Sequence, residues 1–159
     1  MISDVAAFGA YFERVYERTL EVAQAVPPAR IDWRPAPGEL TCGEIIRHIA
    51  ATELMNMRAV ASGEMRYPGH HADLGTTHAA AIAYLETCHA EAQAMLRALD
   101  PQRLQLNIPG QWQDVPGWRR LLGMIEHEIH HRSQLCTYLT LLGCTPPALF
   151  GIHVEDLPT

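Results

Sequence analysis

The sequence lacks the features that mark several common classes of protein. It has no dense block of lysine and arginine, and 12 basic against 18 acidic residues give a formal net charge of −6. Because binding to DNA or RNA needs a basic surface that neutralises phosphates, nucleic acid is not expected as a partner. No apolar run approaches the ~20 residues that cross a bilayer, so a membrane is not expected as a partner either.

Secretion signals and paired cysteines are missing as well. The first residues, MISDVAAFGAYFERVYE, lack the basic start and the apolar block of a signal peptide. The four cysteines are scattered, without any C-x-x-C spacing, at Cys42, Cys88, Cys136 and Cys144. In a chain with 48% hydrophobic residues, long enough to bury one core, such cysteines indicate reduced thiols and not disulfides. We therefore expect one cytoplasmic domain over residues 1–159.

Long strand patterns are absent, and four segments instead repeat apolar residues at helical spacing. The expected helices are 3–26, 41–62, 77–99 and 115–142, followed by an irregular tail at 144–159. Ser3 is the expected N-cap of the first helix, and Thr41 with Glu44 forms a capping box at the second. Pro116 falls in the first turn of the fourth helix, and a short extended piece near residues 104–108 is compatible with the sequence. The pattern predicts an all-α protein, a single four-helix bundle.

The expected helices are joined by long connections, at 27–40, 63–76 and about 100–113. Antiparallel neighbours in a simple bundle usually have shorter loops. Fourteen extended residues reach ~46 Å, which exceeds the ~33 Å length of a 22-residue helix. At least one connection is therefore long enough to run back along the bundle and join two parallel helices.

Histidine is the unusual residue of this chain, with nine copies, of which three fall between positions 127 and 131. His127 and His131 are one helical turn apart, a spacing that puts β-carbons ~5–6 Å apart and lets two imidazoles share an ion. His48 has apolar neighbours on its own face of the second expected helix, so it should point inward. Three buried imidazoles without partners are costly, whereas one ion satisfies all three. His48, His127 and His131 are therefore predicted to bind a divalent metal.

The other histidines have simpler interpretations. A lone histidine on an apolar face is more often a packed core residue than a ligand, and His89 is interpreted in this way. His130 lies on the far side of His127 around the fourth helix and is not expected to bind the metal. His70 and His71 are expected in a solvated loop.

Glu128 falls in the middle of the apolar arc of the fourth expected helix, where a carboxylate needs a partner. Arg132, one turn further along, can supply that partner in a structural ion pair. A second interpretation places Glu128 beside the metal ligands as an acid or base. The sequence leaves both interpretations open.

Two segments of the chain resemble one protein family. The segment HEIHHRSQLCTYLTLLG at 127–143 resembles the last-helix signature of the DinB-like (YfiT-like) superfamily, H-x-x-x-H-R-G-Q followed by an apolar run and glycine. Ser133 stands where the family usually has glycine. The earlier family signature is similar to WRPAPG at 33–38, followed by Thr41, Glu44, Ile45 and His48.

This resemblance implies a fold, a site and an activity. The family has four-helix bundles with up-down-down-up topology, frequent homodimers, and a metal held by one histidine of helix two and two of helix four. Those ligands correspond to His48, His127 and His131, which suit zinc, nickel or iron alike. Characterised relatives include transferases and isomerases that use low-molecular-weight thiols such as bacillithiol or mycothiol. The resemblance therefore implies a metal-dependent thiol transferase acting on a small molecule, with Arg132 or Tyr138 as candidate substrate contacts.

Two other functions stay open at this point. His127, Glu128 and His131 match H-E-x-x-H, in which the glutamate of zinc proteases is a general base, and Glu155 is a candidate third ligand. The lack of a strand that could hold a peptide counts against proteolysis, but metal-assisted hydrolysis of a small molecule remains possible. The other alternative is a metal-binding stress-response protein without catalytic activity. A pocket at the metal site would favour an enzyme.

Overall fold

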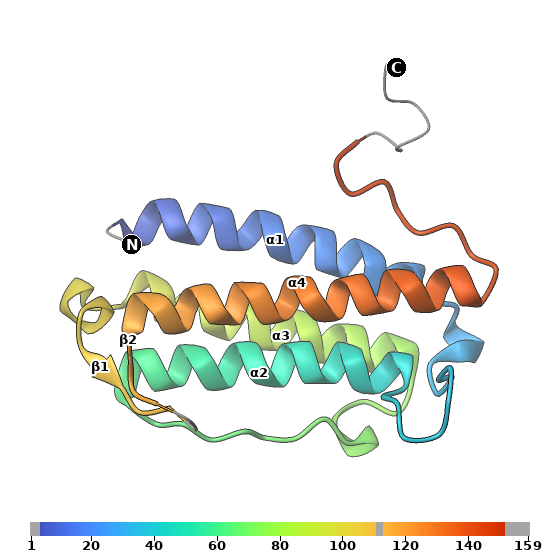
Figure 1. Cartoon of the computed structure of the whole chain (residues 1–159), viewed down its shortest axis with the longest axis horizontal. Coiled ribbons are helices and arrows are strands. Elements are labelled where there is room, and N and C mark those ends of the chain that lie inside the picture. Colours follow the sequence, from blue (N-terminus) through green and yellow to red (C-terminus); the bar gives the residue numbers. More distant parts are fainter. Residues whose placement is uncertain (1–3, 111–112, 152–159) are drawn as a thin grey trace.

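Four long helices pack side by side in the computed structural model, which describes residues 4–110 and 113–151 (Figure 1). They are α1 (Val5–Ala25), α2 (Cys42–Ser62), α3 (His78–Arg97) and α4 (Gly117–Leu141). In Figure 1, α1 and α4 run from left to right, whereas α2 and α3 run from right to left. The predicted all-α bundle and its up-down-down-up order are confirmed. None of the described helices is long and apolar enough to cross a membrane.

The helix ends follow local side-chain chemistry. The predicted capping box opens α2: the Thr41 backbone N–H donates to Glu44 Oε2 at 2.7 Å, and the Glu44 N–H donates to Thr41 Oγ1 at 3.1 Å. α2 ends at Gly63, whose φ of 85° places it in the left-handed region that favours glycine. Asp4 caps α1 by accepting from two backbone N–H groups. The expected cap, Ser3, lies outside the described residues.

The start of α4 differs from the expected one. Val115–Pro116 does not form the first helical turn but is strand β2, which pairs antiparallel with strand β1 (Asn107–Ile108). Proline lacks an N–H and fixes φ near the extended region, so it is compatible with this edge position. The helix therefore begins at Gly117. Short 3₁₀ helices lie in the connections, at Pro28–Arg30 (η1), Ala72–Leu74 (η2) and Pro101–Leu104 (η3).

The connection between α2 and α3 runs the length of the bundle, as Figure 1 shows, and makes these two helices parallel. The Arg47 side chain of α2 holds this crossover in place: Nε donates to the His70 carbonyl at 2.9 Å and Nη1 to the Gly75 carbonyl at 2.7 Å. Arg47 is only 2% exposed. The crossover is therefore docked on α2 and carries residues 64–74 along the outside of the bundle.

Two apolar clusters make up the core, one toward each end of the bundle. One includes Val22, Ile45, Leu85 and Leu135, and the other includes Phe12, Met57, Leu96 and Leu121. Buried polar side chains lie between these two sets along each helix, namely Thr19, Glu53, His89, Glu128 and Arg132. Each of the four helices contributes to this polar layer.

His89 is the centre of the polar layer. Its Nδ1 lies 2.9 Å from Glu53 Oε1, its Nε2 lies 3.2 Å from Glu13 Oε2, and the Tyr16 ring stacks on it at 3.5 Å. His89 is buried, as expected, but it is hydrogen-bonded as well as packed. Burial raises the pKa of Glu53. Burial alone would lower the pKa of His89, but hydrogen bonds and charges from Glu53 and Glu13 raise it above its ordinary value.

These shifts predict how stability depends on pH. Both groups have raised pKa values in the folded state, so above about pH 4.5, the ordinary pKa of glutamate, the folded protein binds more protons than the unfolded chain. Stability therefore falls as pH rises. The free energy of unfolding of the wild type minus that of Glu53→Gln should therefore decrease as pH rises from about 5 to about 8. Urea denaturation at a series of pH values measures this difference.

The matched control is Glu17→Gln, which makes the same change at an exposed position of α1. The difference between this variant and the wild type should stay nearly constant over the same range. A constant difference for Glu53→Gln as well would contradict the prediction.

Candidate metal centre

Three histidines from two helices converge between α2 and α4. His48 comes from α2, His127 and His131 come from α4, and each offers one ring nitrogen within 4.8 Å of the other two. His48 Nε2 lies 2.9 Å from His127 Nε2. The His131 ring centroid lies 4.7 Å from that of His48 and 4.4 Å from that of His127. The structure thus brings together the three residues that the sequence analysis selected.

The donor set fits a single divalent ion. Zinc–nitrogen bonds of ~2.0–2.1 Å in tetrahedral geometry put ligand nitrogens about 3.3 Å apart. Here two of the ring nitrogens are 2.9 Å apart and all three lie within 4.8 Å of one another, so small side-chain shifts would give that spacing. The three rings are half-buried. Three protein ligands leave at least one coordination position open, as in catalytic zinc sites. These residues could therefore hold a metal and still admit a ligand.

Polar neighbours fix the outer nitrogens of two of these rings. His131 Nδ1 lies 2.9 Å from Gln134 Oε1, an oxygen that can only accept, so Nδ1 carries the hydrogen and Nε2 is free. His48 Nδ1 lies 2.6 Å from the Tyr67 hydroxyl, which also contacts His70 Nδ1 at 2.7 Å. If His48 donates to Tyr67 and Tyr67 donates to His70, His48 Nε2 keeps its lone pair. This arrangement is typical of metal-binding histidines.

The pKa values of the histidines favour the same state. Burial, with a contribution from His131, lowers the pKa of His48 to about 4. Burial and the neighbouring histidines lower the pKa of His127 to about 3, and burial also lowers the pKa of His131. Both His48 and His127 are thus neutral at neutral pH, the form that binds metal. Burial raises the pKa of Tyr67 to about 12, so its hydroxyl keeps its proton.

The structure separates Glu128 from the histidines. Glu128 is 2% exposed, and burial together with the Glu53 carboxylate raises its pKa to about 7. Among the described residues, neither of its oxygens has a hydrogen-bond partner. The expected ion pair with Arg132 is not formed within this part of the chain, and the Arg132 guanidinium donates to the Val15 carbonyl of α1 at 3.2 Å. No described contact joins Glu128 to the three histidines.

The remaining predicted residues have distinct places. His130 is exposed and lies outside the group of three. Tyr138 is buried, and its hydroxyl accepts from Gln134 Nε2 at 3.2 Å, so it supports the residue that orients His131. Glu155, the candidate ligand of the hydrolase interpretation, lies outside the described residues.

Sequence reasoning missed Tyr67 and His70. His70 was expected in a solvated loop, but it is half-buried and bonded through Tyr67 to His48. No local pattern marks these residues, because only the path of the crossover brings them to α2. Gln134, in contrast, had a signal: it lies three residues after His131, on the same side of the helix.

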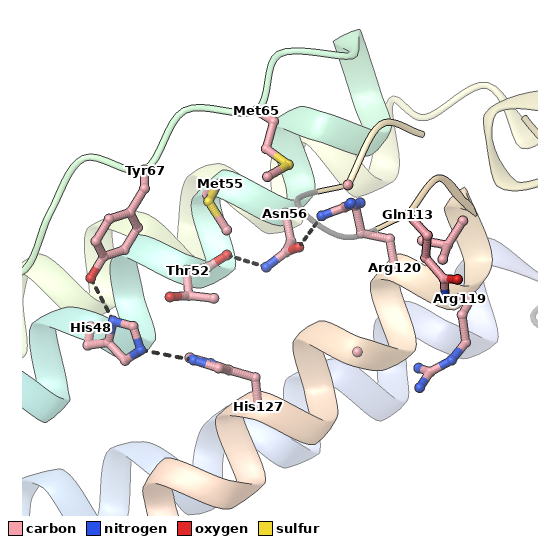
Figure 2. A pocket seen from close by; sticks show the side chains of 13 residues that line it. His48, Thr52, Met55, Asn56, Met65, Tyr67, Gln113, Arg119, Arg120 and His127 are labelled. Atoms are coloured by element: carbon pink, nitrogen blue, oxygen red, sulfur yellow. Dashed lines mark hydrogen bonds between the residues drawn. The ribbon is translucent and has the colours of Figure 1, made fainter. Parts of the chain in front are cut away.

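A pocket of about 740 Å³ opens beside His48 and His127, within the size range of small-molecule sites. Figure 2 shows Tyr67, His48 and His127 at one end, Asn56 and Arg120 in the half away from them, and Gln113 and Arg119 beyond. Thr52 and Met55 lie between the histidines and Arg120 in Figure 2, and Met65 and Val115 also line the pocket. The candidate metal centre is thus accessible from a cavity that is polar at both ends and mostly apolar between them.

The sequence over residues 11–135 matches the DinB superfamily, and the chain belongs to this family. Among solved structures, a DinB-like protein from Bacillus subtilis is similar, with 22% identity and a TM-score of 0.75, covering 90% of this chain and 96% of that one. A DinB-like protein from Bacillus cereus has 19% identity and a TM-score of 0.76, covering 96% of this chain and all of that one. Nothing among the curated proteins matches the chain.

The ligand set can be tested by substitution. His48→Ala removes one of three donors, so the metal content of protein purified without an affinity tag should fall sharply. Helical circular dichroism should stay nearly unchanged, because the two apolar clusters do not depend on the site. His130→Ala is the matched control and should keep the metal content of the wild type. Full metal stoichiometry in His48→Ala would show that the ligand set is wrong.

The role of the crossover can be tested with Tyr67→Phe. This variant removes the hydroxyl that orients His48, and we expect metal affinity to fall ~10–100-fold, measured by competition with a chelator. Tyr11→Phe, at an exposed position of α1, is the control for a lost hydroxyl and should leave the affinity unchanged. Equal affinities for both variants would rule out an orienting role for Tyr67.

Proposed function

We propose that the protein is a metal-dependent transferase or isomerase that uses a low-molecular-weight thiol. The observation that supports this proposal most is the pocket beside the three histidines. A metal with only a structural or storage role is better protected when protein groups close its coordination sphere. Here two of the three candidate ligands, His48 and His127, line a cavity large enough for a substrate.

Each residue near the site has a defined task in this proposal. His48, His127 and His131 hold the ion, and as neutral ligands they leave its double charge undiminished. When bound, the ion supplies a positive charge that lowers the pKa of a thiol or water and so provides a nucleophile at neutral pH. Tyr67 and Gln134 keep the rings oriented, and Tyr138 acts through Gln134. Arg132 and Tyr138 are buried away from the cavity, so neither is proposed as a substrate contact.

Hydrolysis is less well supported as an alternative. A zinc protease of the H-E-x-x-H type needs its glutamate as a general base on the substrate side. The Glu128 carboxylate is buried in the polar layer instead, and none of the described residues that line the pocket is acidic. A thiol is far more acidic than water, so it depends less on a general base than water does, and this favours a thiol as the nucleophile at a pocket whose described lining is not acidic. The homodimer implied by the family resemblance stays a prediction.

Activity assays test this proposal directly. Zinc-, nickel- and iron-reloaded protein is supplied with glutathione, cysteine, bacillithiol or mycothiol and with chlorodinitrobenzene as the acceptor. In the reaction sulfur bonds to the ring carbon, chloride leaves with the electron pair of the C–Cl bond, and the thiol proton passes to solvent. We expect at least one combination to exceed the uncatalysed rate. His127→Ala or chelation of the metal should reduce this rate enhancement about tenfold or more.

His130→Ala is the control and should react like the wild type. Metal-loaded protein that accelerates no thiol transfer, or a rate that chelation does not change, would contradict the proposal.

A further inference from the structure

Arg120 of α4 is a cation with unused hydrogen-bond donors at the end of the pocket opposite the histidines (Figure 2). Its Nη1 donates to Asn56 Oδ1 at 3.2 Å and its Nη2 to the Pro109 carbonyl at 2.7 Å. A guanidinium carries five N–H donors, so these two bonds leave three. Its Nε is buried and has no partner among the described residues, and none of their carboxylates forms an ion pair with it.

The surroundings hold Arg120 in place without neutralising it. Asn56 Nδ2 donates to the Thr52 carbonyl at 2.8 Å, which orients the amide so that its oxygen faces Arg120. Burial lowers the pKa of Arg120, the charge of Asp114 partly offsets this effect, and an arginine stays charged in proteins. A partly desolvated cation with fixed geometry, which forms no ion pair with the described carboxylates, is a costly arrangement for stability alone. Arg120 is well suited to binding an anion, because its side chain is already held in one conformation and binding would cost little further conformational entropy.

Arg119, the next residue, provides a contrast within the same pocket wall. Its Nη2 lies 3.0 Å from the Glu126 carboxylate, so its charge is already paired on the exposed surface of α4. Only Arg120, of these two arginines, is therefore available to a ligand as a full counter-charge.

The spacing of the two ends limits the shape of that ligand. Arg120 and His127 are seven residues apart on α4, which corresponds to two turns on the same face and a rise of ~10.5 Å. Met55 lies between them in Figure 2, and Met65 and Val115 also line the pocket. A molecule that fills the pocket thus has a reactive group at one end, a mostly apolar middle and an anionic group at the other end.

We propose that Arg120 binds the carboxylate of a ligand whose opposite end reaches the three histidines. A planar carboxylate matches the guanidinium fork and can accept two parallel hydrogen bonds. One cation without an ion pair among the described residues also matches one negative charge. This inference rests on the proposed function for the identity of the ligand: the carboxylate belongs either to the thiol or to the acceptor that the thiol attacks.

Two binding arms distinguish these sources, both measured by calorimetry on zinc-reloaded protein. The first compares mercaptohexanoate with mercaptohexanol, which differ only at the end remote from the sulfur. The second compares nitrobenzoate with dinitrobenzene, which lack the chloride leaving group and so undergo no displacement, as ligands of protein saturated with mercaptoethanol. We expect the carboxylate to bind about tenfold or more tightly than its neutral partner in at least one arm. Arg120→Gln should remove this preference in that arm.

Two further variants keep the result specific. Arg119→Gln removes an equal charge from the same wall and should keep most of the preference, because Glu126 already pairs with Arg119. Arg120→Lys keeps the charge but loses the fork, so it should retain only part of the preference, and it carries the test if Arg120→Gln does not fold. Metal content and helical circular dichroism check each variant. No preference in either arm, or equal losses in Arg119→Gln and Arg120→Gln, would overturn the proposal.

The test separates this inference from the proposed function. A preference that depends on Arg120 in a protein that catalyses no thiol transfer would support the anion site and refute the transferase. Metal-dependent thiol transfer without any carboxylate preference would support the transferase and refute the anion site.

Discussion

Arg47 carries its charge inside the bundle, and the path of the long connection between α2 and α3 depends on how that charge is solvated. Because the Arg47 guanidinium is buried, it donates hydrogen bonds to carbonyl groups of the connection, at His70 and Gly75. The backbone at Gly75 also passes so close to α3 that a β-carbon there would lie 2.9 Å from Ala80. The crossover is therefore fixed at both contacts, and Tyr67 is carried to the ring of His48.

Neighbouring residues of α4 serve different parts of the molecule because successive side chains turn ~100° around a helix. His127 and His131 face α2, and His127 also lines the pocket, whereas Glu128 and Arg132 face the polar layer of the core. Burial acts on both groups of side chains, but with opposite results. It keeps the histidines neutral and free to bind a metal, and it raises the pKa of Glu128 so that the carboxyl holds its proton more tightly.

The pocket has two different electrostatic environments, one at the histidines and one at Arg120. One end presents neutral imidazoles that need a cation, and the other presents a fixed cation that needs an anion. Arg120 and His127 are two helical turns apart, so an anionic group held by Arg120 would not itself reach an ion at the histidines. In our proposal, the site selects ligands by the distance between their functional groups as well as by their chemistry, which is a common basis of specificity in enzymes of small molecules.

Local physics was enough to predict much of this protein from its sequence. Helix periodicity located the four helices, the Thr41–Glu44 capping box fixed the start of α2, and the i to i+4 spacing of His127 and His131 identified the candidate metal centre. Each of these signals lies within a few residues of the chain. His48 also emerged, because its helical face is apolar and the family signature includes it.

Tertiary structure alone decided which residues meet at the two ends of the pocket. Tyr67 and His70 reach His48 only because the crossover follows one particular path. Arg120 contacts Asn56, which lies 64 positions earlier in the sequence. The expected Glu128–Arg132 pair is not formed in the described part of the chain, where the guanidinium contacts a carbonyl of α1 that lies far away in the sequence. Helical periodicity gives the face on which a side chain lies, but it does not reveal which distant segment packs against that face.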